Sequence, residues 1–412
     1  MRICVLSTAT TAHQMGGTEV HAEALAAEAA RQGHTVLMVS SAHPAGIESE
    51  QKNGYEVRYL PGTDFSMSRR AARLWWEKSA SALDALWKSW KFDVIWAENN
   101  AAKAYATLPR RRRAPVISII NGPGIIGGIL SNFNRVSTLS ELLYFLTWYP
   151  AQQIFYGIPW FRATVRNSDL LAAVSLETAA ALAFEFPSSR SKTVVLFNQA
   201  DTQLFRPDAA MRAAARKEFG FGEKEPVVLM AGVLHKQKGV IEGLKAFADI
   251  AQKRPEVRLL IAGDGPERKK LEEAAAAWGV SDKTVFCGMR ANSDMPRYYN
   301  AADIYLNPTL RHEGLPLVIV EAMACGLPSV ISRIGGTGST IDEGVSGYYV
   351  KPGKEKELAE KLELLAGDPE LRARLGEKAR EKAVKVFDKK AILQKYISAS
   401  LKLISAPKAE GK

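Results

Sequence analysis

The sequence predicts an α/β protein with two domains, each built on a parallel, doubly wound sheet. Its 412 residues are too many for one ordinary core. Short runs rich in β-branched residues alternate with alanine-rich helical stretches, and this alternation occurs in both halves of the chain. In such sheets ligands bind beyond the carboxyl ends of the strands, so the functional residues are expected in the loops that follow them.

The expected strands are short apolar runs bounded by polar or glycine-containing turns. In the first half they are ICVLS, TVLMVS, DVIWA and APVISII, with TEVHAEALAAEAARQG as a helix between the first two. In the second half they are PVVLMAGVL, VRLLIAGDG, KTVFCG, ADIYLNPT and LPSVIS. The polar stretch FNQADTQLFRPD places the boundary between domains 1–200 and 201–387, and apolar spacing predicts a last helix at about 388–406.

Composition and cysteine content indicate a globular protein with reduced thiols. With 47% hydrophobic and 24% charged residues, the chain is globular rather than disordered. Cys4, Cys287 and Cys325 are scattered in apolar runs, which indicates reduced thiols in a cytoplasmic protein and neither a disulfide framework nor a zinc site. The N-terminus lacks the long apolar core and cleavage site of a signal peptide.

Two segments raise the question of membrane contact. Between Arg69 and Arg113, 11 Lys and Arg face 4 Asp and Glu, and no RNA-binding aromatic motif accompanies them, so nucleic acid is not expected as a partner. The run Leu142–Phe161 is the most hydrophobic, but Pro150, Gly157 and Pro159 interrupt it. We therefore expect it to be interfacial or buried rather than membrane-spanning, and it could hold a lipid-linked acceptor.

The basic segment predicts a helix with tryptophans on one stripe and cations on its flank. The stripe is Ala72, Trp76, Leu83, Trp87 and Trp90, and the flank is Arg70, Arg73, Lys88 and Lys91. One interpretation is a core-packing helix with a solvated edge. The other is a membrane-surface helix, to which Arg110–Arg113 would add. We favour, as a hypothesis, peripheral attachment to the anionic inner face of a membrane.

The stretch RHEGLPLVIVEAMACGLPSV carries two glutamates, Glu313 and Glu321, in an apolar setting. A helix is expected to begin at Pro316, and its first amides, from Leu317 and Val318, would form an anion site. Carboxylates on either side of it suit the hydroxyl groups of a nucleoside diphosphate sugar. The alternative is that Glu313 is only a helix-start carboxylate and Glu321 a solvated helix residue.

A second element supports the functional interpretation. VVLMAGVLHKQKG runs from a buried strand into a glycine, Gly232, and ends in cations, the last being Lys238. A lysine there could bind the same diphosphate. The alternative is a basic turn that is exposed to solvent and binds no ligand, which is the commoner case for a single such turn.

These residues also carry a family resemblance. The chain resembles the family 4 retaining glycosyltransferases of the GT-B fold over most of its length. The markers are EGLPLVIVEAMACGLP, the KG of LHKQKG, GDGP, AADIYLNP, GGT and SGYYVKPG, with MGGTEVH, RQGHTVLMVS, SDLLAAVS and FNQADTQLFRPD in the first half. The resemblance implies two Rossmann-like domains facing across a deep cleft, with the terminal helix packing back on the N-terminal, acceptor-side domain.

Site roles follow from the resemblance position by position. It implies that Glu321 binds the donor ribose, that Glu313 lies beside the donor sugar and that Lys238 lies beside the diphosphate, which makes Glu313 and Lys238 the catalytic candidates. The implied donor-binding set is Gly16, Gly17, Gly232, Lys238, Met289, Glu313, Gly314, Leu315, Leu317, Val318 and Glu321. Asn121 and Glu98 are assigned to the acceptor or the sugar. The resemblance implies that no metal or other cofactor is used, and the chain has no Asp-x-Asp pair to hold a cation.

The chain departs from the family pattern at three positions. Val233 stands where the family usually has an arginine, Asn121 where a histidine is common, and Ser339 where glutamate is frequent. Asparagine can hydrogen-bond a sugar hydroxyl but cannot shuttle a proton.

The expected function is retaining transfer of a hexosyl group from a nucleotide sugar, UDP rather than GDP, to a hydroxyl of a glycan or lipid-linked acceptor in envelope polysaccharide or glycolipid synthesis. Two alternatives stay open. One is a UDP-sugar epimerase of the same fold, and the other is a nucleotide-sugar binder without turnover. The expected location is cytoplasmic, peripheral on the inner face of the membrane.

Overall fold

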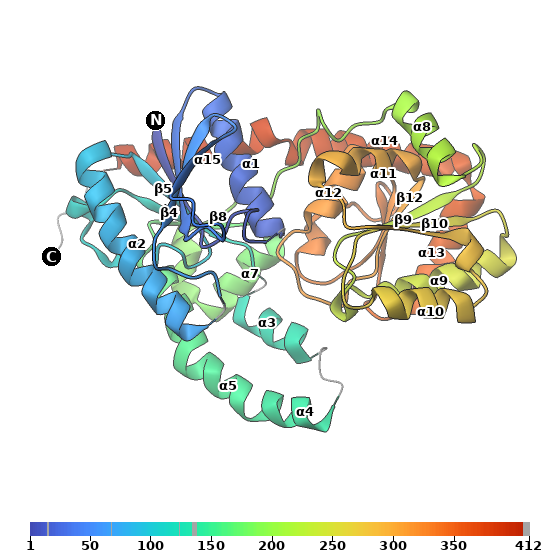
Figure 1. Ribbon diagram of the computed structural model, residues 1–412, viewed down its shortest axis with the longest axis horizontal. Helices are drawn as coiled ribbons and strands as arrows, with labels where there is room; N and C mark the ends of the chain where they lie inside the picture. The colour runs from blue at the N-terminus through green and yellow to red at the C-terminus, as the bar shows by residue number, and fades with distance from the viewer. Residues whose placement is uncertain (15, 67, 123, 134–137, 407–412) are drawn as a thin grey trace. The chain divides into compact units, whose positions relative to one another are not determined.

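The computed structural model describes residues 1–412 apart from 15, 67, 123, 134–137 and 407–412, so Met15 of the MGGTEVH motif lies outside the described residues. The chain forms two compact units (Figure 1). The first comprises Met1–Gly127, Thr138–Gln199 and Lys389–Lys412, and the second comprises Gly128–Ser137 and Ala200–Asp388. Where the sequence placed the boundary after residue 200, the structure divides the chain after Gln199.

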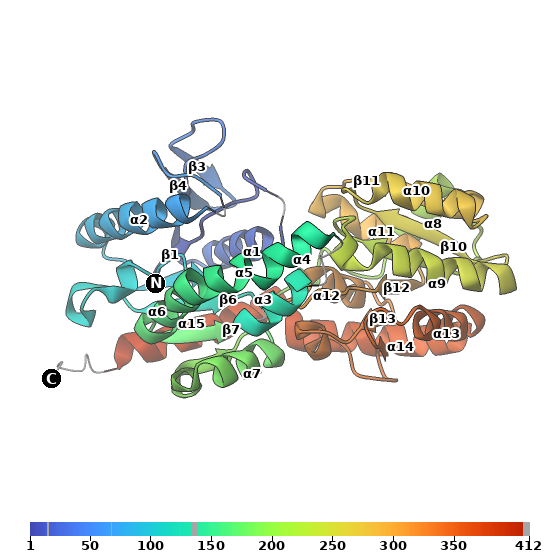
Figure 2. The same ribbon diagram turned by 90° about the horizontal axis from the view of Figure 1, so that it is seen from below.

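The first unit contains an eight-stranded sheet in the order β3-β4-β2-β1-β5-β6-β7-β8. All neighbours are parallel except β3 and β4, a hairpin at one edge (Figure 2). The four expected strands are present, whereas β3, β4, β7 and β8 were not predicted as strands. β3 is polar and β8 has three residues, whereas β4 does alternate buried and less buried residues, and this strand pattern was overlooked. The bounds are β1 Arg2–Leu6, β2 Thr35–Ser41, β3 Ser49–Lys52, β4 Tyr55–Leu60, β5 Val94–Glu98, β6 Val116–Ile120, β7 Leu170–Ala173 and β8 Thr193–Val195.

The helices of the first unit include the expected terminal helix. Its Ser400 hydroxyl accepts a hydrogen bond of 3.0 Å from the indole of Trp96 on β5, so this helix packs on the first unit, as expected. Among the described residues no helix is long and apolar enough to cross a membrane. The bounds are α1 Gly17–Arg31, α2 Arg69–Trp90, η1 Tyr105–Thr107, η2 Arg110–Arg112, α3 Gly124–Phe133 (which continues into the second unit), α4 Leu139–Leu146, α5 Trp148–Gln152, the π-helix η3 Gln153–Gly157, α6 Ile158–Asn167, α7 Leu176–Glu185, η4 Pro187–Lys192 and α15 Lys389–Ser405.

Helix α2 is the predicted tryptophan-rich helix, and it packs into the core. Trp76 and Leu83 are buried as expected, and Trp75, which the predicted stripe omitted, is 2% exposed. The indole nitrogens of Trp75 and Trp76 donate to the carbonyls of Ala101 and Asn100 at 3.0 and 2.9 Å. The aromatic side of α2 is therefore turned to the sheet, as in the core-packing interpretation.

Two of the four arginines at positions 110–113 form ion pairs within the first unit. Arg113 is buried and forms an ion pair of 2.6 Å with Asp169, which Arg110 approaches to 3.1 Å. Arg111 and Arg112 remain exposed. The membrane hypothesis counted all four arginines as surface cations, and for Arg113 this was wrong.

The second unit contains a six-stranded sheet, all parallel, in the order β11-β10-β9-β12-β13-β14. The five expected strands are present, and β14 was not predicted. The bounds are β9 Val227–Ala231, β10 Arg258–Ala262, β11 Thr284–Gly288, β12 Ile304–Asn307, β13 Ser329–Ser332 and β14 Gly347–Val350. From β9 the strand order runs through β10 to β11 at one edge, and from β12 it runs through β13 to β14 at the other. The topological switch point therefore lies between β9 and β12.

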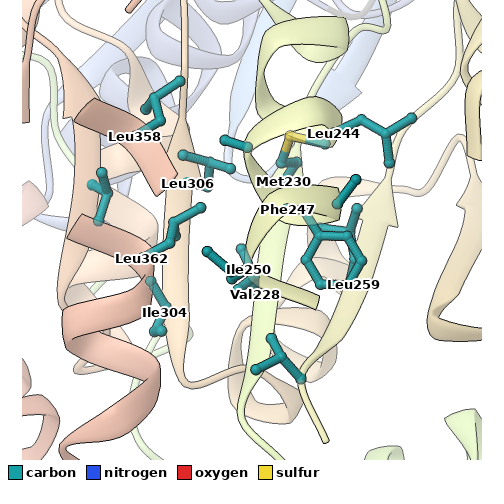
Figure 3. Close-up of a cluster of buried hydrophobic side chains, with 14 of the residues drawn as sticks. Val228, Met230, Leu244, Phe247, Ile250, Leu259, Ile304, Leu306, Leu358 and Leu362 are labelled. Atoms are coloured by element: carbon teal, nitrogen blue, oxygen red, sulfur yellow. The ribbon is translucent and has the colours of Figure 1, made fainter. Parts of the chain in front are cut away.

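Helices cover both faces of this sheet. Figure 1 shows α9, α10 and α13 on one face and α8, α11, α12 and α14 on the other. Leu244 and Phe247 of α9 and Leu358 of α13 meet strand residues such as Val228 and Leu306 in one core cluster (Figure 3). The bounds are α8 Ala209–Phe219, η5 Lys236–Lys238, α9 Val240–Lys253, α10 Arg268–Ala277, η6 Ser281–Lys283, η7 Asn292–Asp294, α11 Met295–Ala301, α12 Leu317–Ala324, η8 Gly336–Ser339, α13 Glu355–Gly367, α14 Pro369–Lys382 and the π-helix η9 Ala383–Phe387.

Candidate active site

The loops after β9 and β12 form the candidate site in the second unit, at the switch point of its sheet. They are joined by a hydrogen bond of 2.9 Å from the Leu310 amide to the Gln237 carbonyl. Gly239 has a φ of +64°, and a Cβ there would lie 2.0 Å from the Pro308 carbonyl oxygen. Only glycine allows this approach of the two loops.

Lys238 and Glu313 meet across these two loops. Nζ of Lys238 lies 2.7 Å from Oε2 of Glu313, and the Thr309 hydroxyl donates to the other carboxylate oxygen at 3.1 Å. Their side chains are 29% and 16% exposed, so both are accessible but partly shielded. The Glu313 carbonyl accepts a 2.8 Å hydrogen bond from the Gly336 amide, which fixes the backbone of this residue as well.

Helix α12 starts beside this ion pair. Pro316 occupies its N-cap position, one residue before the helix rather than at its first residue as the sequence predicted. Proline makes no side-chain cap hydrogen bond here, and the first amides of a helix have no intrahelical acceptor. Leu317 and Val318 are both half-buried, so their amides supply donors at the positive end of the helix dipole.

Glu321 is buried in α12 and held by two side chains. The Tyr299 hydroxyl donates to Oε2 at 2.8 Å, and the Asn292 amide donates to Oε1 at 3.1 Å. Burial raises the pKa of Glu321, and these two hydrogen bonds act in the opposite direction. The alternative that Glu321 is a solvated helix residue is therefore wrong, since its side chain is inside the protein.

The remaining predicted residues of the second unit lie around these two loops or at the end of β11. Gly232 follows β9 with a φ of +126°, and Val233 beside it is 48% exposed. Gly314 and Leu315 are buried before α12. Met289 follows Gly288 at the end of β11 and is 66% exposed, so its side chain is available to a ligand.

Glu98 and Asn121 lie at the carboxyl edge of the sheet in the first unit. The Asn121 side-chain amide donates to Oε2 of Glu98, and the backbone amide of Asn121 donates to the Asn99 side chain at 3.1 Å. Burial raises the pKa of Glu98 to about 8. The other oxygens of the pair, Oε1 of Glu98 and Oδ1 of Asn121, are buried without a hydrogen-bond partner among the described residues.

The two predicted glycines of the first unit mark the start of a helix. Gly16 is the N-cap of α1 and Gly17 its first residue. A Cβ on Gly16 would lie 2.3 Å from the Glu19 carboxylate, whereas one on Gly17 would meet nothing within 4 Å.

Sequence reasoning missed the residues that hold the two glutamates in place. Tyr299 and Asn292 belong to none of the predicted motifs, and Thr309, the last residue of the expected strand ADIYLNPT, was given no role in the site. Across the described residues, no three His, Cys, Asp or Glu side chains gather where they could hold a metal ion, and the three cysteines are free.

The family model described as "Glycosyltransferase Family 4" matches residues 15–204, and the one described as "Glycosyl transferases group 1" matches residues 211–382. N-acetyl-alpha-D-glucosaminyl L-malate synthase from Bacillus anthracis is 25% identical over 93% of both chains. Alpha-D-kanosaminyltransferase from Streptomyces kanamyceticus is 33% identical, but over only 44% of this chain and 45% of that protein.

Solved structures agree on the fold. Sucrose-phosphate synthase from Thermosynechococcus elongatus superposes with a TM-score of 0.78 at 20% identity, covering 98% of this chain and 99% of the other. The Anabaena protein HepE, solved in complex with UDP-glucose, superposes with a TM-score of 0.74 at 22% identity and the same coverage. With two doubly wound units and these matches, the chain belongs to the family 4, group 1 glycosyltransferases of the GT-B fold.

Proposed function

We propose that the protein is a retaining hexosyltransferase that uses a nucleotide sugar, UDP rather than GDP, and transfers the sugar to a hydroxyl of a glycan or lipid-linked acceptor in envelope polysaccharide or glycolipid synthesis. The observation that carries this proposal is the cluster at the switch point of the second unit. There Lys238, Glu313 and the start of α12 lie together, with Glu321 buried in the same helix.

The cluster suits a diphosphate leaving group. Cleavage of the sugar–phosphate bond places negative charge on the diphosphate, and the Lys238 ammonium and the amides of Leu317 and Val318 are donors fixed before the reaction. Loss of one such preorganised donor typically raises the barrier by about 3 kcal/mol. Lysine carries three N–H donors, so Lys238 can keep its bond to Glu313 while it contacts a phosphate oxygen.

The two carboxylates suit the groups on either side of the diphosphate. Glu321, fixed by Tyr299 and Asn292, would accept hydrogen bonds from the ribose hydroxyls. Glu313, fixed by Lys238 and Thr309, would accept from a hydroxyl of the donor sugar. For the transfer itself we propose attack on the same face of the sugar, with the leaving phosphate taking the acceptor proton. No side-chain nucleophile is then required.

We further propose that no metal ion takes part, because Lys238 and the helix start supply the positive charge that a cation would otherwise bring to the diphosphate. Turnover should therefore survive EDTA and should not rise when Mg²⁺ or Mn²⁺ is added. A rate that collapses in EDTA and returns with Mg²⁺ would refute this part of the proposal.

The test of the function is a metal-free incubation with a panel of UDP- and GDP-sugars and a membrane lipid extract, followed by proton NMR. An α-linked product from an α-linked donor, with release of one nucleotide, would establish retaining transfer and identify the donor. UDP-glucose is the first donor to try. A new epimer formed without acceptor would show an epimerase, and nucleotide binding with no product on any donor would show a binder without turnover.

A further inference from the structure

A large apolar surface lies on the helices between β6 and β7 of the first unit. We define the apolar helical surface by six side chains of α4, α5 and η3: Leu139, Leu143, Leu146, Trp148, Ile154 and Phe155. Leu139 is 73% exposed, Trp148 63% and Phe155 70%, and the other three are more than half exposed. Figure 1 shows α4 and α5 standing away from the sheet of this unit. Exposed apolar side chains gathered on consecutive short helices mark a candidate interaction site.

One charged residue, the exposed Glu141, lies on α4 between Leu139 and Leu143, and the rest of the segment is uncharged. Residues 142–161 contain no Asp, Glu, Lys or Arg. Tryptophan and tyrosine accompany the leucines, and these are the aromatic residues that favour the boundary between water and lipid. The apolar residues alone would equally suit a hydrophobic protein partner. The charged residues around the surface distinguish the two kinds of partner.

Cations border the surface. The Arg69 guanidinium, at the start of α2, lies 3.6 Å from the ring centre of Tyr156, which belongs to η3. Arg70 is exposed on the same end of α2, as is Arg73, which lies 3.8 Å from the Glu77 carboxylate. Arg162 is exposed on α6, immediately after the apolar run. An apolar patch bordered by arginines is complementary to a bilayer with anionic headgroups, where each cation near the surface contributes roughly 1 kcal/mol.

We propose that the apolar helical surface and its arginine border dock this protein on an anionic lipid bilayer. A second copy of the chain fits less well, because each copy carries a net charge of +11 and brings the same arginines to the contact. Because α4, α5 and η3 are short, they would lie in the interface, as amphipathic helices do when their apolar side enters about 5–10 Å.

The residues that contact lipid in this docking mode differ from those expected from the sequence. The membrane hypothesis from the sequence relied on the tryptophans of α2 and on the arginines at 110–113, but Trp75, Trp76 and Arg113 are buried. Helix α2 contributes its exposed arginines instead, and the apolar contact comes from residues 139–156. The proposal does not depend on the transferase activity, since it concerns the first unit alone.

Vesicle co-sedimentation of the full chain tests the proposal. Phosphatidylglycerol-containing vesicles should sediment the protein, and pure phosphatidylcholine vesicles should sediment far less. Phe155→Ser combined with Leu146→Ser should lower the partition coefficient at least about tenfold. The variant loses the free energy gained when the two large apolar side chains move from water into the bilayer. Phe184→Ser is the matched control, because Phe184 is 75% exposed on α7, outside this surface, and its loss should not change binding.

Two further measurements separate this proposal from its rivals. Brominated lipids should quench tryptophan fluorescence of the bound protein, and Trp148→Phe should remove most of the quenching. The urea unfolding curve of the Phe155, Leu146 double variant should match that of the wild type, which shows that the first unit, where both residues lie, is still folded. Equal binding by the double variant and the Phe184 control would overturn the proposal. So would a dimer in sedimentation velocity that the double variant abolishes, combined with no binding to vesicles.

Discussion

Lys238 and Glu313 are 75 residues apart in the chain, yet their charged groups form an ion pair of 2.7 Å. The pair joins the loops that follow β9 and β12, the two strands at the switch point. Breaking a partly buried pair by removing one partner leaves the other without its counter-charge. Substitutions at this pair should therefore affect both ligand affinity and the local structure, and the variants must be chosen to separate the two effects.

Lys238→Ala should weaken UDP binding about tenfold to a hundredfold, because a charge-assisted hydrogen bond to phosphate is lost. Binding of uridine without phosphates should change little. Isothermal titration with UDP and uridine measures both. Lys236→Ala is the matched control, since Lys236 is an exposed lysine in the same loop and should leave UDP affinity unchanged. Equal losses in the two variants would indicate a general charge effect and not a specific contact.

Glu321→Ala should weaken the binding of both UDP and uridine by about tenfold or more, because the acceptor for the ribose hydroxyls is removed. Glu321→Gln keeps the shape of the side chain and one acceptor oxygen, so we expect an intermediate affinity. Titration with uridine separates this effect from that of Lys238. Wild-type affinity for uridine in a folded Glu321→Ala protein would remove the assigned role.

Stability should depend on pH through Glu98. Burial raises its pKa in the folded chain to about 8 from an ordinary value of 4.5, so the folded state keeps a proton that the unfolded state releases. The stability that the neutral Glu98 carboxyl contributes is fully present below pH 4.5. As the pH rises toward 8, the free energy of unfolding falls by up to about 1.4 kcal/mol per pH unit.

The groups facing Glu98 are the Asn121 amide, the Glu19 carboxylate, whose charge raises the pKa of Glu98 further, and the Tyr396 hydroxyl. Burial, and then the charge of Glu98, raise the pKa of Tyr396. Glu98→Gln keeps a neutral side chain at all pH values. Urea unfolding between pH 5 and 8 should therefore show a shallower loss of stability in this variant than in the wild type. Parallel pH profiles for the two proteins would mean that Glu98 is ionised in the folded state.

Gly239→Ala should destabilise the second unit by roughly 3 kcal/mol or more, because the new Cβ would meet the Pro308 carbonyl and the φ of +64° strains an alanine. Gly220→Ala is the control. Gly220 has a φ of +72° but nothing within 4 Å of a Cβ, so only about 1 kcal/mol of backbone strain is expected. Thermal unfolding measures both, and equal shifts would show that the two loops can separate without cost.

The sequence predicted the core strands of both sheets and the site glutamates because these depend on local patterns. An apolar run such as VVLMA marks a buried strand wherever it lies, and a proline before an apolar run marks a helix start. The edge strands were missed for the same reason. The polar strand β3 and the three-residue β8 have no pattern of their own and form because a neighbour offers backbone hydrogen bonds.

The sequence by itself determined the alternation of strands and helices, the order of the family motifs, and the placing of Lys238 and the two glutamates in or after loops that follow strands. Only the tertiary structure decided that Lys238 binds Glu313, that Tyr299 and Asn292 hold a buried Glu321, and that the apolar residues of α4 to η3 stay exposed while Trp75 does not. Periodicity is a property of neighbouring residues, whereas burial and pairing are set by which distant elements pack together.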